Sequence, residues 1–108
     1  MKTKIKQADR KKMFGTHFTG LVVKTSVKAI REILGDEVES SNDGQDKTNF
    51  DFVFELNYKT VFTMYDWKMY RPIELDEIVE FHVGTKENID KYDVKLALER
   101  LGFDCGFE

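Results

Sequence analysis

The sequence predicts an α+β domain with the element order β-α-β-β-β-α: a four-stranded, mostly antiparallel sheet with two helices packed on one face. Three observations predict it. Residues 48–86 contain three consecutive runs in which apolar and polar side chains alternate, as in half-buried strands. Two other stretches repeat apolar residues at helical spacing and are each followed by glycine. Each helix has only one apolar stripe, so the second face of the sheet is expected to be open to solvent.

The first strand and the first helix follow a segment without periodicity. Residues 1–15 are predicted to be a basic N-terminal tail, and residues 16–108 a single domain. The β-rich run at 18–24 (FTGLVVK) is the first strand. Thr25 or Ser26 then caps a helix, because either hydroxyl can accept from the free N–H groups of the first turn. The stripe of this helix is Val27, Ile30, Ile33 and Leu34, and Gly35 ends it.

Residues 36–47 form a polar, acidic loop, and the remaining strands and the last helix follow it. The strand at 50–57 is expected to bury alternate residues and wet the others, and a tight turn at 57–60 leads into the strand at 60–68. The last strand spans 77–83. Its core residues are expected to be Val79, Phe81 and Val83. Asn88 or Asp90 is expected to cap the last helix, whose stripe is Tyr92, Val94, Leu96, Leu98 and Leu101 and which stops at Gly102.

Composition bounds the class of protein. The chain has 108 residues, of which 41% are hydrophobic, enough to fold around one modest core. Cys105 is the only cysteine, which excludes an internal disulfide framework and suits a reducing compartment. The sequence has no apolar run of membrane-spanning length and no signal peptide. We therefore expect a cytoplasmic protein with no membrane partner.

Charge is distributed unevenly along the chain. Residues 1–12 contain six bases and one acid. The whole chain contains 17 bases and 20 acids, so the residues beyond position 12 contain 11 bases and 19 acids, a net charge of −8. An acidic body repels phosphates, so direct binding of nucleic acid is expected only through the basic tail. Most acids of the loop are expected to be solvated, while such loops can also contact a basic partner.

The polar and aromatic residues of the last two strands form the candidate site. If Phe62 and Met64 join the core, Tyr65 and Trp67 lie on the open face of the sheet, beside Glu80 and His82 of the next strand. A shift of one residue would bury Trp67 and expose Asp66 and Lys68 instead. We favour the first register. The candidate ligand- or partner-binding residues are Tyr65, Asp66, Trp67, Lys68, Arg71, Glu80 and His82.

The sequence contains little catalytic machinery. No serine or cysteine lies near the candidate site to act as a nucleophile for His82, and there is no glycine-rich phosphate loop. His17 and His82 lack the spacing of metal ligands. The structural alternative to a binding role of Asp66 is a local ion pair with Lys68 or Arg71. We therefore expect no enzyme activity, no cofactor and no metal.

Two motifs on neighbouring predicted strands are shared with a known group of proteins. They are YDWK at 65–68, with Arg71 close behind it, and EFHVG at 80–84; the ILG at 33–35 and the helix after Gly84 also fit. On these motifs, residues 18–102 resemble small phage-type proteins of unknown or barely known function. The group commonly has a second glycine where this chain has Thr85, and Trp where it has Phe81. The resemblance implies a phage accessory protein in the cytoplasm of the bacterial host, without implying an activity.

Three functions are compared on these grounds. The leading hypothesis is inhibition of a host protein, for instance a factor of a defence system such as CRISPR or of nucleic-acid processing, through an acidic surface. The runner-up is binding or sequestering a small ligand such as a nucleotide, stacked on Tyr65 and Trp67 and held by Lys68, Arg71 and His82. The third is nucleic-acid binding through the tail. Unpaired strand edges also favour a homodimer. The predicted acidic partner surface is Glu37, Glu39, Asp43, Asp46, Glu74, Asp76 and Glu77.

Overall fold

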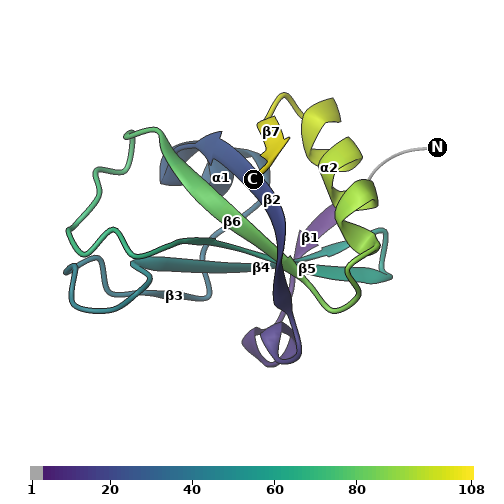
Figure 1. Ribbon diagram of the computed structural model, residues 1–108, viewed down its shortest axis with the longest axis horizontal. Helices are drawn as coiled ribbons and strands as arrows, with labels where there is room; N and C mark the ends of the chain where they lie inside the picture. Colours follow the sequence, from purple (N-terminus) through teal and green to yellow (C-terminus); the bar gives the residue numbers. More distant parts are fainter. Residues whose placement is uncertain (1–3) are drawn as a thin grey trace.

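A computed structural model describes residues 4–108, which form one open antiparallel sheet of seven strands and two α-helices (Figure 1). The strands run in the order β1-β4-β5-β6-β2-β7, and β3 pairs with β4 on the same edge as β1. The helices are α1, Val27–Ile33, and α2, Asp90–Arg100, with a short 3-10 helix, η1, at Arg10–Met13. The strands are β1 Ile5–Gln7, β2 His17–Thr25, β3 Glu39–Ser40, β4 Phe50–Leu56, β5 Thr60–Asp66, β6 Val79–Thr85 and β7 Asp104–Phe107.

One core lies between the helices and one face of the sheet. Phe52, Phe54, Phe62 and Phe81 are fully buried there, with Val27 and Ile30 of α1 and Val94 and Leu98 of α2 among their neighbours in the same cluster. In Figure 1, β2 and β6 cross steeply over β4 and β5, as the twist of an antiparallel sheet requires. The α+β class and both predicted helices are thus confirmed.

The predicted number of four strands is wrong, because three short strands extend the sheet. The described part of the predicted tail supplies β1 and η1, while residues 1–3 lie outside the described residues. The acidic loop supplies β3, and the chain's last residues supply β7, which pairs with β2. These segments have little β propensity of their own. They become strands because the long strands β4 and β2 offer unpaired edges.

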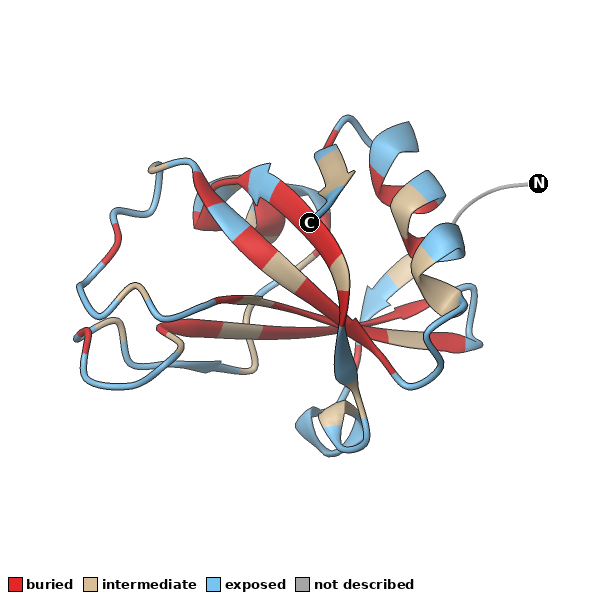
Figure 2. Cartoon of the chain, in the orientation of Figure 1, coloured by how far each residue is buried: buried red, intermediate tan, exposed pale blue. Residues whose placement is uncertain are grey.

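The second face of the sheet is partly covered, since nearly all of β4 is buried, including residues of that face (Figure 2). Val53 and Glu55 of β4 were expected to face water, but they are 0% and 7% exposed. The segment that contains η1 covers them: Lys12 donates from Nζ to Glu55 Oε2 over 2.6 Å, and the Ala8 N–H donates to the Val53 carbonyl. The end of this face that carries Tyr65 and Trp67 remains accessible.

Helix α2 differs from the prediction in two respects. Its N-cap is Ile89 and no side chain caps it, so neither Asn88 nor Asp90 does. Of the predicted stripe, Val94 and Leu98 are buried, whereas Tyr92, Leu96 and Leu101 are exposed. Residues two positions apart on an α-helix are rotated by about 200°, so Leu96 points away from the core that Val94 enters. In α1, Ser26 is the N-cap and accepts from the Ala29 N–H, but Ile33 is 49% exposed rather than part of the buried stripe.

Candidate functional site

Four aromatic rings meet on the open face of the sheet, and we call them the aromatic cluster: Phe18, Tyr65, Trp67 and His82. The register that buries Phe62 and Met64 is the one observed, and it pairs Tyr65 of β5 with His82 of β6. The cluster comes from three adjacent strands and the residue after β5.

His82 lies at the centre of this cluster. Its ring stacks on Phe18 with a centroid distance of 4.0 Å and an interplanar angle of 14°. Trp67 lies 6.1 Å away on a nearly parallel plane, and Tyr65 meets it edge-on at 5.7 Å. Phe18 and Trp67 are 41% and 39% exposed, so the cluster presents apolar ring surface to solvent.

Burial sets the protonation of the cluster. It lowers the pKa of His82, and this effect is opposed by the negative charges of Glu108 and Glu80. The neutral imidazole is therefore favoured, which suits stacking between two apolar rings. Burial also raises the pKa of the Tyr65 phenol, with a smaller contribution from the negative charge of Asp51. The cluster is thus a hydrophobic surface with polar edges.

Asp51 lies in the same row across the sheet as Tyr65 and His82. It pairs with Tyr65 between β4 and β5, and Tyr65 pairs with His82 between β5 and β6. Burial raises the pKa of the Asp51 carboxyl, although the Thr48 hydroxyl, which donates to it over 2.9 Å, acts in the opposite direction. The carboxylate therefore destabilises the fold at neutral pH. Sequence analysis missed Asp51 and Phe18. Phe18 is an even number of residues from Val22 and Lys24, which the alternation of β2 places on the open face. This alternation is the sequence signal that could have predicted Phe18 as a member of the cluster.

Two lysines flank the indole of Trp67. The Nζ atoms of Lys68 and Lys47 lie 5.5 and 5.8 Å from the centre of the ring, within cation–π range. The two residues are also linked through the backbone, because the Lys68 N–H donates to the Lys47 carbonyl over 2.7 Å. The exposed edge of the cluster therefore carries positive charge on an otherwise acidic protein.

Asp66 does not belong to this surface. Its side chain is fully buried and accepts hydrogen bonds from the backbone N–H groups of Asn49 and Phe50 and from Asn49 Nδ2, at 2.8 to 3.1 Å. The alternative of an ion pair with Lys68 or Arg71 is therefore wrong as well. The alternation of β5 points Asp66 inward, where only neutral donors are within reach. Its role is to join the start of β4 to the end of β5.

The same network fastens two long loops together, residues 41–49 and 67–78. Asn49 Nδ2 donates to the Arg71 carbonyl, and Asn42 exchanges two hydrogen bonds with the backbone of Ile73. Gly44 lies so close to Arg71 that a Cβ atom would come within 2.7 Å of its Cα. Lys47, Trp67 and Lys68 are therefore carried by loops that are held in place.

The remaining predicted site residues are dispersed. Arg71 donates from both terminal nitrogens to Glu77 and takes no part in the aromatic cluster. Glu80 is exposed on β6, where Lys24 is its neighbour on β2.

The predicted acidic surface is partly neutralised by arginines. Glu37 accepts two hydrogen bonds from Arg31, which lower the pKa of its carboxyl, and Glu39 forms an ion pair with Arg10 at 2.9 Å. Glu77 is bound to Arg71. Four acids of the set are exposed and form no ion pair within residues 4–108: Asp43, Asp46, Glu74 and Asp76.

Comparison of the sequence with models of known protein families gave no match, and neither did comparison with curated proteins. Among residues 4–108, no group of three or more His, Cys, Asp or Glu side chains could hold a metal ion. Neither α-helix of this part of the chain has the length and apolar character needed to cross a membrane. Function must therefore be argued from the geometry of the surface.

Proposed function

We propose that this protein is a phage accessory protein that binds and inhibits a protein of its host, and that the contact is made by the aromatic cluster. The observation that carries the proposal is the meeting of four rings on an open sheet face, with Phe18 and Trp67 each about 40% exposed. Aromatic side chains of this kind dominate the binding energy of protein interfaces. The phage origin rests on the resemblance of the YDWK and EFHVG motifs, and the inhibitory role rests on the small size of the domain and its net charge of −8 beyond residue 12.

The surroundings of the cluster favour a protein partner. Lys47 and Lys68 lie on one side of it, and Glu80 and Glu108 on the side of His82. Charges of both signs around an apolar centre are typical of a protein interface, where the rim sets orientation and partner choice. The acidic surface is the weaker candidate, because three of its seven carboxylates are already bound to arginines.

The proposal is tested by isolating partners from host lysate with the wild-type protein and with Trp67→Ala. Binding is then measured with the purified partner. Trp67→Ala should weaken binding by about 30-fold or more, since a central aromatic anchor contributes about 2 kcal/mol or more. Tyr70→Ala is the matched control, because Tyr70 is 56% exposed and lies outside the cluster. Failure to recover a partner at low salt, or equal binding by both variants, contradicts the proposal. If neutralising the four unpaired acids abolishes binding while Trp67→Ala does not, the acidic surface is the contact.

A second candidate is binding of a nucleotide base on Trp67, which the two flanking lysines favour. Trp67 is the only tryptophan, so its fluorescence reports on this site alone. Quenching by a nucleotide, reduced in the double variant Lys47→Ala/Lys68→Ala, supports this function. An emission that a nucleotide panel leaves unchanged excludes it.

A further inference from the structure

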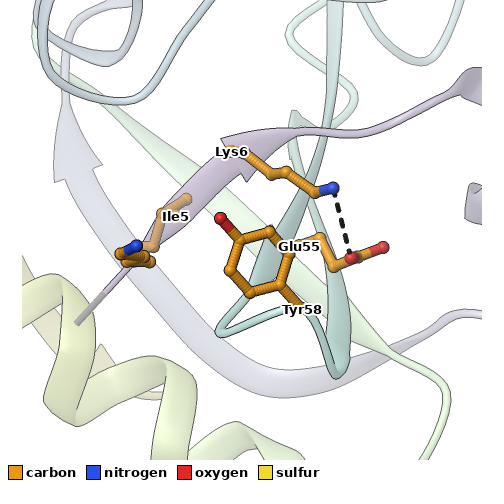
Figure 3. A pocket seen from close by; sticks show the side chains of 5 residues that line it. Ile5, Lys6, Glu55 and Tyr58 are labelled. Atoms are coloured by element: carbon orange, nitrogen blue, oxygen red, sulfur yellow. Dashed lines mark ion pairs between the residues drawn. The ribbon is translucent and has the colours of Figure 1, made fainter. Parts of the chain in front are cut away.

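A cavity of about 330 Å³ lies where β1 meets the β4–β5 hairpin, near the end of β5 opposite to Trp67 (Figure 3). It is lined by Lys4, Ile5, Lys6, Glu55 and Tyr58. Its volume falls at the lower end of the range for small-molecule sites. Neither the sequence motifs nor the proposed function uses it.

Positive charge exceeds negative charge around this cavity. The Nζ atoms of Lys6 and Lys4 lie 4.8 and 5.9 Å from the centre of the Tyr58 ring. Glu55 is the one acid of the lining, and Lys12 and Lys6 approach it at 2.6 and 3.8 Å. The hydrogen bond from Lys12, together with Lys6, lowers the pKa of Glu55, so this carboxylate stays charged. Within the lining, the two ammonium groups of Lys4 and Lys6 against the one carboxylate of Glu55 leave an excess of one positive charge, and the ammonium group of Lys12, which is bound to Glu55, adds positive charge nearby.

The backbone holds the lining residues in place. Lys6 pairs with Glu55 across β1 and β4, and two hydrogen bonds join Lys4 to Asn57. Tyr58 itself has a φ of +60°, a left-handed conformation that costs a bulky residue about 1–2 kcal/mol. The turn thus keeps an exposed aromatic ring between two lysines at a cost in stability. Asn57 also has a positive φ, and the Lys59 N–H donates to the Leu56 carbonyl, so both central residues have the conformation that a type I′ hairpin turn requires.

We propose that this cavity binds the phosphate group of a small phosphate ester. The excess of positive charge at the lining attracts a phosphate group, and lysine binds phosphate as a point charge, without the planar fork that favours carboxylate recognition by arginine. The Tyr58 ring then packs against the organic part of the ligand. A long nucleic acid is disfavoured, because the chain beyond residue 12 has a net charge of −8. This inference is independent of the aromatic cluster.

The experiment measures binding of adenosine 5′-monophosphate, adenosine and inorganic phosphate at low salt, by backbone amide NMR. The monophosphate should shift the amides of Lys4, Lys6 and Tyr58, inorganic phosphate should compete with it, and adenosine should bind at least 10-fold more weakly. The double variant Lys4→Gln/Lys6→Gln should reduce affinity at least 10-fold. Both lysines are exposed, so the fold should persist.

The control is Lys47→Gln/Lys68→Gln, which removes the same charge at the other end of β5. Equal weakening by both double variants means unspecific attraction and overturns the proposal. So does adenosine binding as tightly as its monophosphate, a lack of competition by inorganic phosphate, or shifts confined to Trp67 and its neighbours. The proposed function is tested separately, since it depends on Trp67→Ala and a protein partner.

Discussion

The two ends of β5 carry the same chemical pair in different settings. Tyr58 precedes the strand and Trp67 follows it, and each ring has two lysine ammonium groups within 6 Å of its centre. At Trp67, the rings of Tyr65 and His82 lie alongside, and hydrogen bonds join the two loops that carry the site. At Tyr58, a single ring lies among charged groups near the buried carboxylate of Glu55. A lysine next to an aromatic ring therefore does not define a function, because the packing behind it decides between an apolar surface and a charged cavity.

The largest expected effect is the loss of stability in Asp66→Ala, which should impair binding at the Trp67 end of β5 and spare the Tyr58 end. Asp66→Ala leaves the N–H groups of Asn49 and Phe50 buried without an acceptor, so we expect the free energy of unfolding to fall by about 3–5 kcal/mol. Urea unfolding measures this. Asp76→Ala, at an exposed aspartate, should change it by less than about 0.5 kcal/mol. In the surviving folded protein, the Trp67 end should lose binding while the Tyr58 cavity retains its ligand.

The contact between the two loops is tested at Gly44. Gly44→Ala places a methyl group against the Arg71 backbone at a φ of +75°, and both the contact and the conformation are unfavourable. Gly15→Ala is matched in φ, at +85°, but has no atom within 4 Å of the added group. We expect Gly44→Ala to be the more destabilising by about 1–3 kcal/mol in thermal unfolding. Equal losses would show that the loops are not held by this contact.

The charge at the Tyr58 end is tested at Glu55. Glu55→Gln removes the one negative charge of the cavity, so phosphate affinity should rise by roughly 3-fold, as expected for a nearby charge in a solvated site. Isothermal titration with adenosine 5′-monophosphate measures the change. Binding of a partner through Trp67 should be unaffected. A fall in phosphate affinity would mean that Glu55 organises the lysines rather than opposing the ligand.

The smallest expected effect concerns pH and the Trp67 end. Because burial lowers the pKa of His82, the unfolded chain takes up a proton below its ordinary value of 6.5 while the folded protein resists it. Stability should therefore decline as pH falls through about 6.5, and the decline should stop below the folded pKa. Thermal unfolding at about pH 5 and pH 8 measures this. The difference in stability between the two pH values should largely disappear in His82→Gln and persist in His17→Gln. If it persists in His82→Gln and disappears in His17→Gln, burial of His82 is not its cause.

Most of the fold was predictable because its long elements have strong periodic signals. The alternation of Phe50, Phe52 and Phe54 predicts β4, and the stripe from Val27 to Leu34 predicts α1. The site was predictable in part, since Tyr65 and His82 follow from the same alternation once the register is chosen. Asp66 shares the face of Phe62 and Met64 in the favoured register, so its burial follows from the alternation, whereas the N–H groups of Asn49 and Phe50 that it binds could not be predicted from the sequence.

The sequence by itself determined the α+β class and the long strands, because hydrophobic burial imposes a period of two on strands and 3.6 on helices. The register of β5, and with it the face on which Tyr65, Trp67 and His82 lie, was decided by the structure. Only the tertiary structure decided that residues 5–7 and 104–107 become strands, that η1 covers Val53 and Glu55, and that Lys4, Lys6 and Tyr58 enclose a cavity. The physical reason is distance along the chain. Lys6 and Glu55 are 49 residues apart, and the pairing that joins them depends on an edge that exists only once the sheet has formed.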